Sequence, residues 1–329
     1  MKKRRDQEAI DPGEVRFFSG SSHPQLAADI ASHLNVPLET TDISRFSNDN
    51  LYIQLGASVR SRTVFIVQSL SPPVNDHLME LLMMLDIARG ASANEIHAIV
   101  PYFSFARSDK KDAPRISITA RLVADLLQTA GATQIMTMML HSPQVHGFFG
   151  IPADPLSSRP VFNRYFQQRD LSSTIVVTPD MGHAKSAARF ARDLDLPVAA
   201  GNKERVSDME VHISGIVGHQ IRGCRRALVY DDEIATGGSI LEIGRLLIEQ
   251  GIQEIWVVCT HGVFVRGGLE RIAAVPQITD IVTTDTVNIP PEKHHPKLHV
   301  LSVAHVFGEA IRRNYLRQSI GDLFVFGDA

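Results

Sequence analysis

The sequence predicts an α/β protein made of two similar domains, each with a mainly parallel sheet flanked by helices. Short runs of β-branched and aromatic residues alternate with longer amphipathic stretches, as strands and helices alternate in that class of fold. A set of residues also recurs at an offset of 160 positions. The length of 329 residues fits two domains of about 150 residues each.

In the first half, apolar runs predict buried strands, and stretches with helical spacing of apolar residues predict helices between them. The expected strands are residues 15–20, 63–69, 95–103 and 134–140. The expected helices are residues 24–34, 75–90 and 116–131. Gly90 and Gly131 end two of these helices, and glycine commonly caps a helix C-terminus.

The second half repeats the alternation. Its expected strands are residues 174–179, 226–232 and 254–260, and its expected helices are residues 184–194 and 239–251. Residues 21–38 align with residues 181–198, so that His23 matches His183. We therefore expect two domains of the same fold. We expect a flexible tail at residues 1–14, a first domain at residues 15–155 and a second domain at residues 156–329. The expected boundary lies in a stretch rich in Pro, Gly and Ser.

Composition narrows the class of protein. The net charge of −3 gives no indication of nucleic acid or a membrane surface as a partner. No apolar stretch approaches the roughly 18 residues of a membrane span, and the basic start lacks the apolar segment of a signal peptide. Two cysteines in a long chain do not make a disulfide framework. These features predict a cytoplasmic location.

One loop carries both acids and glycines, in the stretch YDDEIATGGSI at residues 230–240. The segment TGGS stands where a helix begins, and the free N–H groups and the dipole of a helix N-terminus favour a phosphate. Asp231 and Asp232 precede it at the end of a strand, the edge where α/β sheets bind ligands. A sugar phosphate has a group for each part, with hydroxyls for the acids and a phosphate for the loop.

This loop resembles the sugar-phosphate loop shared by type I phosphoribosyltransferases and ribose-phosphate pyrophosphokinases. The stretches at residues 71–93, 100–111, 118–133, 140–152 and 176–182 resemble the second family in order and spacing, and the resemblance covers about residues 15–315. It implies two type I phosphoribosyltransferase-like domains of Rossmann-like architecture. It also implies a Mg²⁺-dependent transfer of diphosphate from ATP to the 1-hydroxyl of ribose 5-phosphate, and a homo-oligomer in which dimers stack into hexamers.

The resemblance assigns roles to residues of both domains. Lys203 and Arg205 would be catalytic cations on a mobile loop, and His141 and Asp180 would belong to the metal site. The residues that would bind ATP are Phe46, Asn48, Asn50, Arg107 and Ser108. The residues that would bind ribose 5-phosphate are Asp231, Asp232, Ala235, Thr236, Gly237, Gly238 and Ser239.

Four functional positions depart from the family pattern. Asn50 replaces a carboxylate, Ser108 a glutamine, Met139 an acid two residues before His141, and Ala235 the aspartate that opens the loop. The substitutions leave two other functions open. One is a non-catalytic subunit that joins an active synthetase, and the other is a phosphoribosyltransferase that attaches a base. Retention of Lys203 and Arg205 favours the synthetase.

Overall fold

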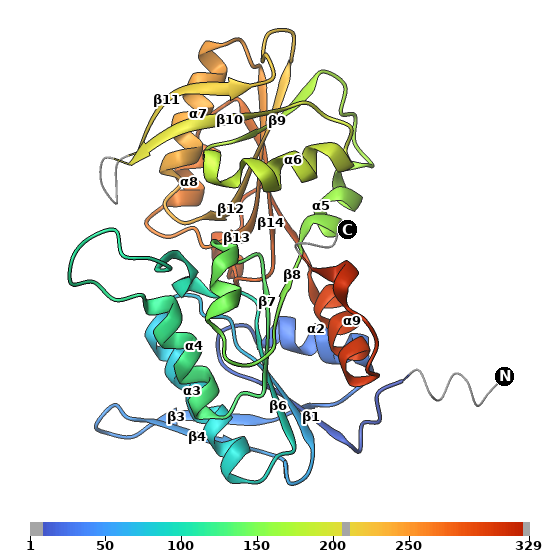
Figure 1. Ribbon diagram of the computed structural model, residues 1–329. Coiled ribbons are helices and arrows are strands. Elements are labelled where there is room, and N and C mark those ends of the chain that lie inside the picture. Colours follow the sequence, from blue (N-terminus) through green and yellow to red (C-terminus); the bar gives the residue numbers. More distant parts are fainter. Residues whose placement is uncertain (1–8, 206–210, 325–329) are drawn as a thin grey trace, which may run out of the picture. The chain divides into compact units, whose positions relative to one another are not determined.

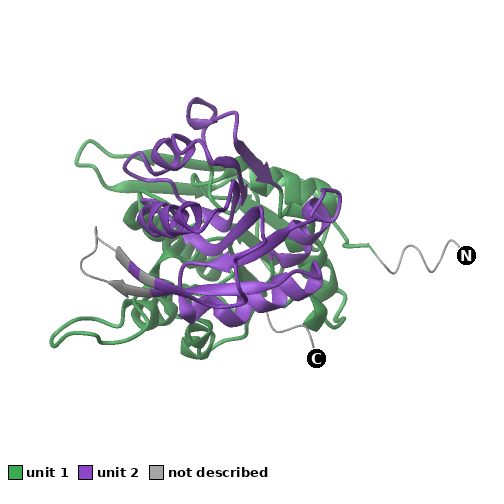
Figure 2. Cartoon of the chain, turned by 90° about the horizontal axis from the view of Figure 1, so that it is seen from above, with its two compact units in different colours: residues 1–157, 286–288, 302–329 green, residues 158–285, 289–301 purple. Residues whose placement is uncertain are grey.

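The computed structural model describes residues 9–205 and 211–324 (Figure 1). The chain divides into two compact units (Figure 2). Unit 1 comprises Met1–Ser157, Thr286–Asn288 and Ser302–Ala329, and unit 2 comprises Ser158–Asp285 and Ile289–Leu301. The expected boundary falls close to the first crossing between the units. Unit 2 is interrupted, because Thr286–Asn288 and Ser302–Ala329 belong to unit 1.

Unit 1 is built on a six-stranded sheet in the order β2-β1-β5-β6-β7-β8, with all neighbours parallel. Its strands are β1 (Val15–Ser19), β2 (Leu38–Glu39), β5 (Thr63–Val67), β6 (Glu95–Val100), β7 (Gln134–Met138) and β8 (Ala153–Leu156). The runs of Val, Ile and Phe in β1, β5 and β6 are almost wholly buried, as strands covered on both faces require.

The helices of unit 1 are α2 (Pro24–Leu34), α3 (Val74–Gly90), α4 (Thr119–Ala130) and α9 (Ala304–Tyr315), with short 3₁₀ turns η1 (Ser104–Arg107), η2 (Pro143–Phe148) and η5 (Gly321–Leu323). Gly131 caps α4 as predicted, with φ of 130° and its N–H donating to the carbonyl of Leu127. The prediction for Gly90 is wrong: it is the last residue of α3, and Ala91 is the cap.

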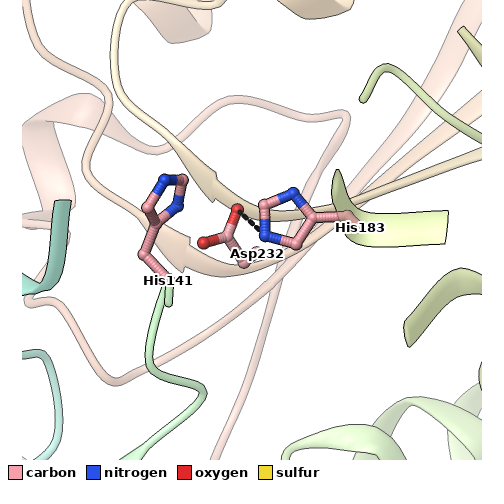
Figure 3. Close-up of side chains that lie close together, drawn as sticks. All are labelled: His141, His183 and Asp232. Carbon is pink, nitrogen blue, oxygen red and sulfur yellow. Dashed lines mark ion pairs between the residues drawn. The ribbon is translucent and has the colours of Figure 1, made fainter. Parts of the chain in front are cut away.

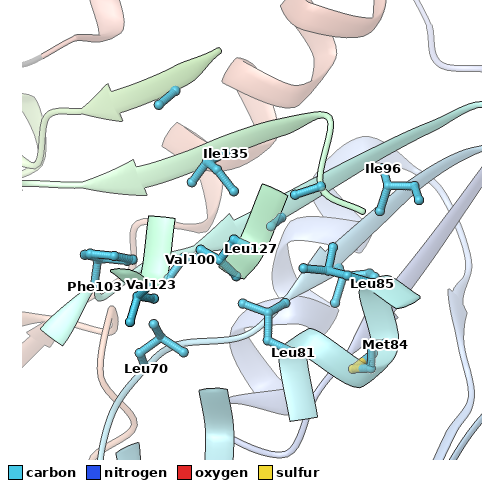
Figure 4. Packing of buried hydrophobic residues seen from close by; sticks show 14 of the residues in the cluster. Leu70, Leu81, Met84, Leu85, Ile96, Val100, Phe103, Val123, Leu127 and Ile135 are labelled. Atoms are coloured by element: carbon cyan, nitrogen blue, oxygen red, sulfur yellow. The ribbon is translucent and has the colours of Figure 1, made fainter. Parts of the chain in front are cut away.

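Helices α3 and α4 pack on one face of this sheet and enclose a hydrophobic core (Figure 4). Leu81 and Leu85 of α3 and Leu127 of α4 have no exposed surface, and they meet Val100 and Ile135 of the sheet. The spacing of 4 along α3 places both leucines on one face of the helix. This core holds the loops at the carboxyl ends of β6 and β7 in place.

The last helix packs on the first. Phe307, Ala310 and Ile311 of α9 are fully buried. A methyl group on Gly308 would come within 2.4 Å of the His33 ring in α2, so the two helices approach closely at that glycine. This contact explains why residues 302–329 belong to unit 1.

The start of the described chain is also packed against unit 1. Ile10 is only 6% exposed. The carboxylate of Glu14 accepts a hydrogen bond from Arg62 at 2.7 Å. The expected tail of residues 1–14 is therefore ordered from Ala9 onward, and residues 1–8 lie outside the described residues.

Unit 2 contains a seven-stranded sheet in the order β11-β10-β9-β12-β13-β14-β15, parallel except for the β10–β11 pair. The strands are β9 (Thr174–Thr178), β10 (Val198–Arg205), β11 (Val211–Gly218), β12 (Arg226–Ile234), β13 (Glu254–Gly262), β14 (Ile278–Thr284) and β15 (Leu298–Leu301). The helices are α5 (Arg159–Phe166), α6 (Ala184–Asp193), α7 (Gly238–Glu249) and α8 (Gly268–Ala273), with η3 (Met181–His183) and η4 (Pro291–Lys293) as 3₁₀ turns.

Alternate residues of the central strands enter two different cores. Val177 and Val229 pack with α7 and α8 on one face of the sheet. Val176, Leu228 and Tyr230 pack with aromatic residues of α5 and α6 on the other. The sheet is thus covered by helices on both faces, which leaves its carboxyl edge as the place for polar side chains. No helix among the described residues has both the length and the apolar composition to cross a membrane.

Candidate functional site

The acid pair lies at the carboxyl end of the central strand β12. Asp231 and Asp232 are 8% and 3% exposed, so both carboxylates are largely removed from solvent. Asp231 accepts a hydrogen bond from the backbone N–H of Asp232 at 2.9 Å. Strand β12 pairs with β9 only as far as Val229, so the acids extend beyond the end of that neighbour.

The glycine loop joins the acids to helix α7. Gly237 is the N-cap of this helix, and the N–H of Leu241 donates to its carbonyl at 3.0 Å. The N–H groups of the helix's first turn have no partner inside the helix. Thr236 and Ser239 place hydroxyls on either side of the two glycines. The predicted phosphate loop therefore has the geometry of an anion-binding helix N-terminus.

Two features fix the path of this loop. Gly237 has φ of +81°, and a methyl group there would meet the Ile272 side chain at 2.8 Å. The carbonyl of Ala235 accepts from the N–H of Val265 at 2.9 Å, and the carbonyl of Thr236 accepts from the Arg271 guanidinium. The loop carbonyls are thereby held by α8 and by the segment that leads into it.

A histidine faces both acids. Nε2 of His183 lies 3.5 Å from Oδ1 of Asp232, the ion pair dashed in Figure 3. Nδ1 of the same ring lies 3.8 Å from Oδ1 of Asp231. Asp180, three residues earlier, accepts the N–H of Gly182 at 2.8 Å and caps η3. The sequence prediction did not include His183 in the site; its repeat match with His23 was the one available signal.

The part of β12 that precedes the two acids packs against apolar and aromatic side chains. The ring of Tyr230 stacks on Phe190 at 4.6 Å, and burial raises the pKa of its hydroxyl to about 12. Burial also raises the pKa of the Cys259 thiol, which lies beside Asp231 in the register of β13. Both groups stay protonated at neutral pH, so the thiol is no nucleophile here.

Lys203 and Arg205 fall in strand β10, which pairs with β9 as far as Ala200 and then continues past it along β11. Their backbone thus extends beyond the same edge of the sheet as the acids. The segment is extended, and a register irregularity separates Gly201 from Lys203. Both side chains lie outside the described residues.

The expected adenine-contacting residues occupy the tip of an antiparallel hairpin in unit 1, formed by β3 (Thr41–Arg45) and β4 (Leu51–Leu55). Phe46 is 56% exposed, and its ring meets the edge of Tyr52 at 5.6 Å. Asn48 and Asn50 are exposed on the same turn. Arg45 pairs with Asp76 of α3 at 3.1 Å, which holds the hairpin against that helix.

The other two predicted ATP-binding residues lie on a separate segment of unit 1. Arg107 ends the turn η1, and Ser108 is its C-cap, with its N–H donating to Phe105. The carbonyl of Ser108 accepts a hydrogen bond from the backbone N–H of Ala120 at 3.2 Å, and this bond joins the loop to α4.

His141 follows β7 in unit 1, whereas Asp180 belongs to unit 2. Met139, which takes the place of an acid in the family pattern, is 6% exposed and has φ of +43°. The backbone N–H of Met139 donates to the carbonyl of Leu156 in β8 at 3.1 Å. This side chain fills the interior and gives no oxygen ligand.

Comparison with known proteins shows the family to which the chain is similar. Residues 15–131 match the family model described as the N-terminal domain of ribose phosphate pyrophosphokinase, and residues 208–325 match the phosphoribosyl synthetase-associated domain. A relative from Streptomyces coelicolor is 50% identical over 94% of this chain and 98% of its own length. The ribose-phosphate pyrophosphokinase of Deinococcus radiodurans is 44% identical over 93% of this chain and 97% of its own length.

A solved structure agrees with these relatives. The phosphoribosylpyrophosphate synthetase of Mycobacterium smegmatis superposes with a TM-score of 0.84 at 32% identity, covering 92% of this chain and 99% of that one. The two sheets, the acid pair with its glycine loop and the relatives all lead to one conclusion. The chain belongs to the ribose-phosphate pyrophosphokinase family, transferases that make phosphoribosyl pyrophosphate from ATP and ribose 5-phosphate.

Proposed function

We propose that this chain transfers the diphosphate group of ATP to the 1-hydroxyl of ribose 5-phosphate, giving 5-phosphoribosyl 1-diphosphate and AMP. The observation that carries the proposal is the buried acid pair of β12, followed at once by the open N-terminus of α7. In the reaction the 1-oxygen of the sugar attacks the β-phosphorus of ATP. The bond from that phosphorus to the α-phosphate oxygen breaks, AMP leaves, and the hydroxyl proton is lost.

The phosphate loop binds the 5-phosphate of the sugar. Backbone N–H groups at Gly238 and Ser239 and the α7 dipole attract the anion, and Ser239 and Thr236 add hydroxyls. The carbonyls of Ala235 and Thr236 are held by other groups, so they need not turn toward the phosphate. The loop thus fixes one end of the substrate.

Asp231 and Asp232 face the ring of the sugar at the other end. Their carboxylates accept hydrogen bonds from ribose hydroxyls. Carboxylate oxygens are also the ligands that Mg²⁺ prefers, so the acids fit that ion, with Asp180 as a further proposed ligand. The resemblance alone proposes His141 for the metal site. When bound, Mg²⁺ would neutralise phosphate charge. The chain's own part is to keep the acids buried and oriented.

Lys203 and Arg205 complete the proposed machinery. Cations near the transferring diphosphate stabilise the charge that develops on it, and such groups contribute most of the catalysis in phosphoryl transfer. The extension of β10 beyond the sheet edge supports this placement. Phe46, Asn48, Asn50, Arg107 and Ser108 would hold ATP, with the exposed ring of Phe46 as a stacking surface for adenine.

The test is incubation of the protein with ATP, ribose 5-phosphate and Mg²⁺, followed by ³¹P NMR. AMP and the product should form, and Asp232→Asn and Lys203→Ala should each lower kcat at least about a hundredfold. Glu249→Gln, a change on the exposed end of α7, serves as the matched control and should leave the rate unchanged. Absence of AMP above the Lys203→Ala background would refute the proposal and favour a non-catalytic subunit. Diphosphate release that needs an added base would favour a phosphoribosyltransferase.

We further propose a homo-oligomer based on dimers that stack into hexamers. Helices α3 and α4 of unit 1 carry exposed apolar side chains. Leu122 and Leu126 of α4 are 51% and 37% exposed, and Met79 of α3 is 50% exposed. Beside them a groove of about 480 Å³ runs between α3, α4 and β4. An apolar surface of this kind supports association of copies.

Analytical ultracentrifugation tests the assembly. The wild-type chain should sediment as an oligomer, and Leu122→Glu should shift it to smaller species. Val217→Glu is the matched control, because Val217 is 57% exposed on strand β11 of the other unit and should tolerate the charge. A monomeric wild type would contradict the proposal.

A cytoplasmic location is proposed from the sequence and is supported by two free cysteines, Cys224 and Cys259. Cell fractionation with an antibody to the chain tests it. Recovery in the membrane or extracellular fraction would contradict it.

A further inference from the structure

The repeat places a histidine before α2 in unit 1 and before α6 in unit 2, but the two histidines make different contacts. In unit 1, Nδ1 of His23 accepts the N–H of Leu26 at 3.2 Å and caps α2. In unit 2, His183 is the N-cap of α6, yet its side chain makes no capping hydrogen bond. It faces Asp231 and Asp232 (Figure 3). The repeat position by itself therefore does not dictate the orientation of the His183 side chain.

The spacing between the imidazole and the acids is too long for direct hydrogen bonds. The separations of 3.5 Å to Asp232 and 3.8 Å to Asp231 exceed the N–H···O range of about 2.7–3.2 Å. Two ligand atoms that share a divalent ion at about 2.1 Å, with a near-tetrahedral angle between them, stand about 3.4 Å apart. The distance from Nε2 of His183 to Oδ1 of Asp232 matches that arrangement.

The environment favours a cation as well. The side chain of His183 is 16% exposed and that of Asp232 is 4% exposed, so the pair is shielded but still reached by solvent. Asp231 adds a second carboxylate on the other side of the ring. A nitrogen ligand next to carboxylates suits first-row transition metals, whereas Mg²⁺ prefers oxygen alone.

We propose that His183 and Asp232 form a binding site for a divalent transition-metal ion, which binds this pair more tightly than Mg²⁺ does because of the imidazole nitrogen. The imidazole donates its Nε2 lone pair and the carboxylate one oxygen, with water or a sugar hydroxyl completing the coordination. The site is a property of the free chain and does not depend on diphosphate transfer, so its test can fail while the proposed function holds.

The experiment measures metal binding to the full chain without nucleotide or sugar. Co²⁺ affinity is determined by calorimetry and by the visible absorption of the bound ion, and Mg²⁺ affinity by competition. His183→Ala should lower the Co²⁺ affinity at least about tenfold and change the Mg²⁺ affinity much less. His294→Ala, which removes an exposed histidine of the same unit, is the matched control and should change neither.

A second variant separates metal binding from folding and from simple charge pairing. His183→Asn keeps a side chain of similar size with an oxygen ligand, and it should lower the ratio of Co²⁺ to Mg²⁺ affinity about tenfold. An unchanged ratio in this variant would overturn the proposal. Tighter Co²⁺ binding by His183→Ala would also overturn it, because His183 would then be a cation that competes with the metal for the acids.

Discussion

At the scale of single residues, the site depends on positions where the backbone leaves no choice of side chain. Gly237 combines a left-handed φ with close contact to Ile272, so the phosphate loop tolerates glycine alone at that position. The sequence alone could suggest this loop as a phosphate site, because acids, glycines and hydroxyls lie within one short stretch. It does not predict that His183 faces the acids, since that contact depends on how η3 turns after β9.

Gly237→Ala should raise the KM for ribose 5-phosphate and lower the free energy of unfolding by about 1–3 kcal/mol, because alanine is strained at φ of +81° and clashes with Ile272. Kinetics and thermal melting measure the two effects. Gly244→Ala is the matched control within α7: its methyl group would meet Ile255 at 3.8 Å, an ordinary contact, and a helical alanine is favoured by about 1 kcal/mol. Equal melting temperatures for the two variants would contradict the argument.

Ala235→Asp should lower the KM for ribose 5-phosphate severalfold, because the added carboxylate can accept from ribose hydroxyls beside Asp231 and Asp232. The family resemblance motivates the change, and the half-buried position of Ala235 at the end of β12 allows it. Steady-state kinetics with varied sugar phosphate measures the effect. A KM that stays the same or rises would indicate that Glu233, the extra acid of this stretch, already fills that role.

At the scale of elements, helix α9 is held by charge at its polar face as well as by apolar packing. Glu309 accepts hydrogen bonds from Arg312 at 2.8 Å and from Arg313 at 2.6 Å. Arg313 also reaches Asp322 of η5 at 2.5 Å. The amphipathic spacing of α3 and α4 could be predicted from the sequence, whereas the partner of a helix such as α9 could not, because periodicity reports which face is buried and not what covers it.

Hydrogen bonds from Arg312, together with Arg313, lower the pKa of Glu309 to about 2, from an ordinary value of 4.5. The ionised form is therefore favoured by folding, and its contribution is complete above pH 4.5 and disappears as the pH falls toward 2. Glu309→Gln should lower the melting temperature by about 1–3 °C at pH 7, a small effect because the pair is partly exposed.

Melting curves of wild type and Glu309→Gln between pH 7 and pH 2.5 check this, and the difference between the two proteins should shrink steadily below pH 4.5. Glu249→Gln, which removes an exposed partner of Arg245, is the control and should have a smaller effect at every pH. A difference that persists at the acidic end would mean that packing, not charge, is responsible.

At the scale of the whole molecule, the repeat in the sequence predicts two related domains, and the structure contains two sheets covered by helices. The offset of 160 residues could reveal this because it compares the chain with itself. It could not reveal that unit 1 is completed by Ser302–Ala329, since those residues have no counterpart in the aligned repeats.

Phe307→Ala should destabilise unit 1 by about 3–5 kcal/mol, because the ring is fully buried where α9 packs in that unit. Urea unfolding followed by circular dichroism measures the loss. Phe46→Ala is the matched control: it removes a ring that is 56% exposed and should leave stability nearly unchanged. A loss for Phe307→Ala as small as the loss for Phe46→Ala would show that α9 contributes little to the stability of unit 1.

The return of the chain to unit 1 has a consequence for biosynthesis. A ribosome makes α2 before it makes unit 2, and it makes α9, the helix that covers part of α2, only after unit 2. All residues of unit 2 leave the ribosome before Ser302, so unit 2 can fold while unit 1 is still incomplete. The buried face of α2 must remain uncovered while all of unit 2 is made. The nascent chain is therefore most exposed to aggregation, or to binding by a chaperone, at its N-terminal half, and that risk ends only when α9 has been released.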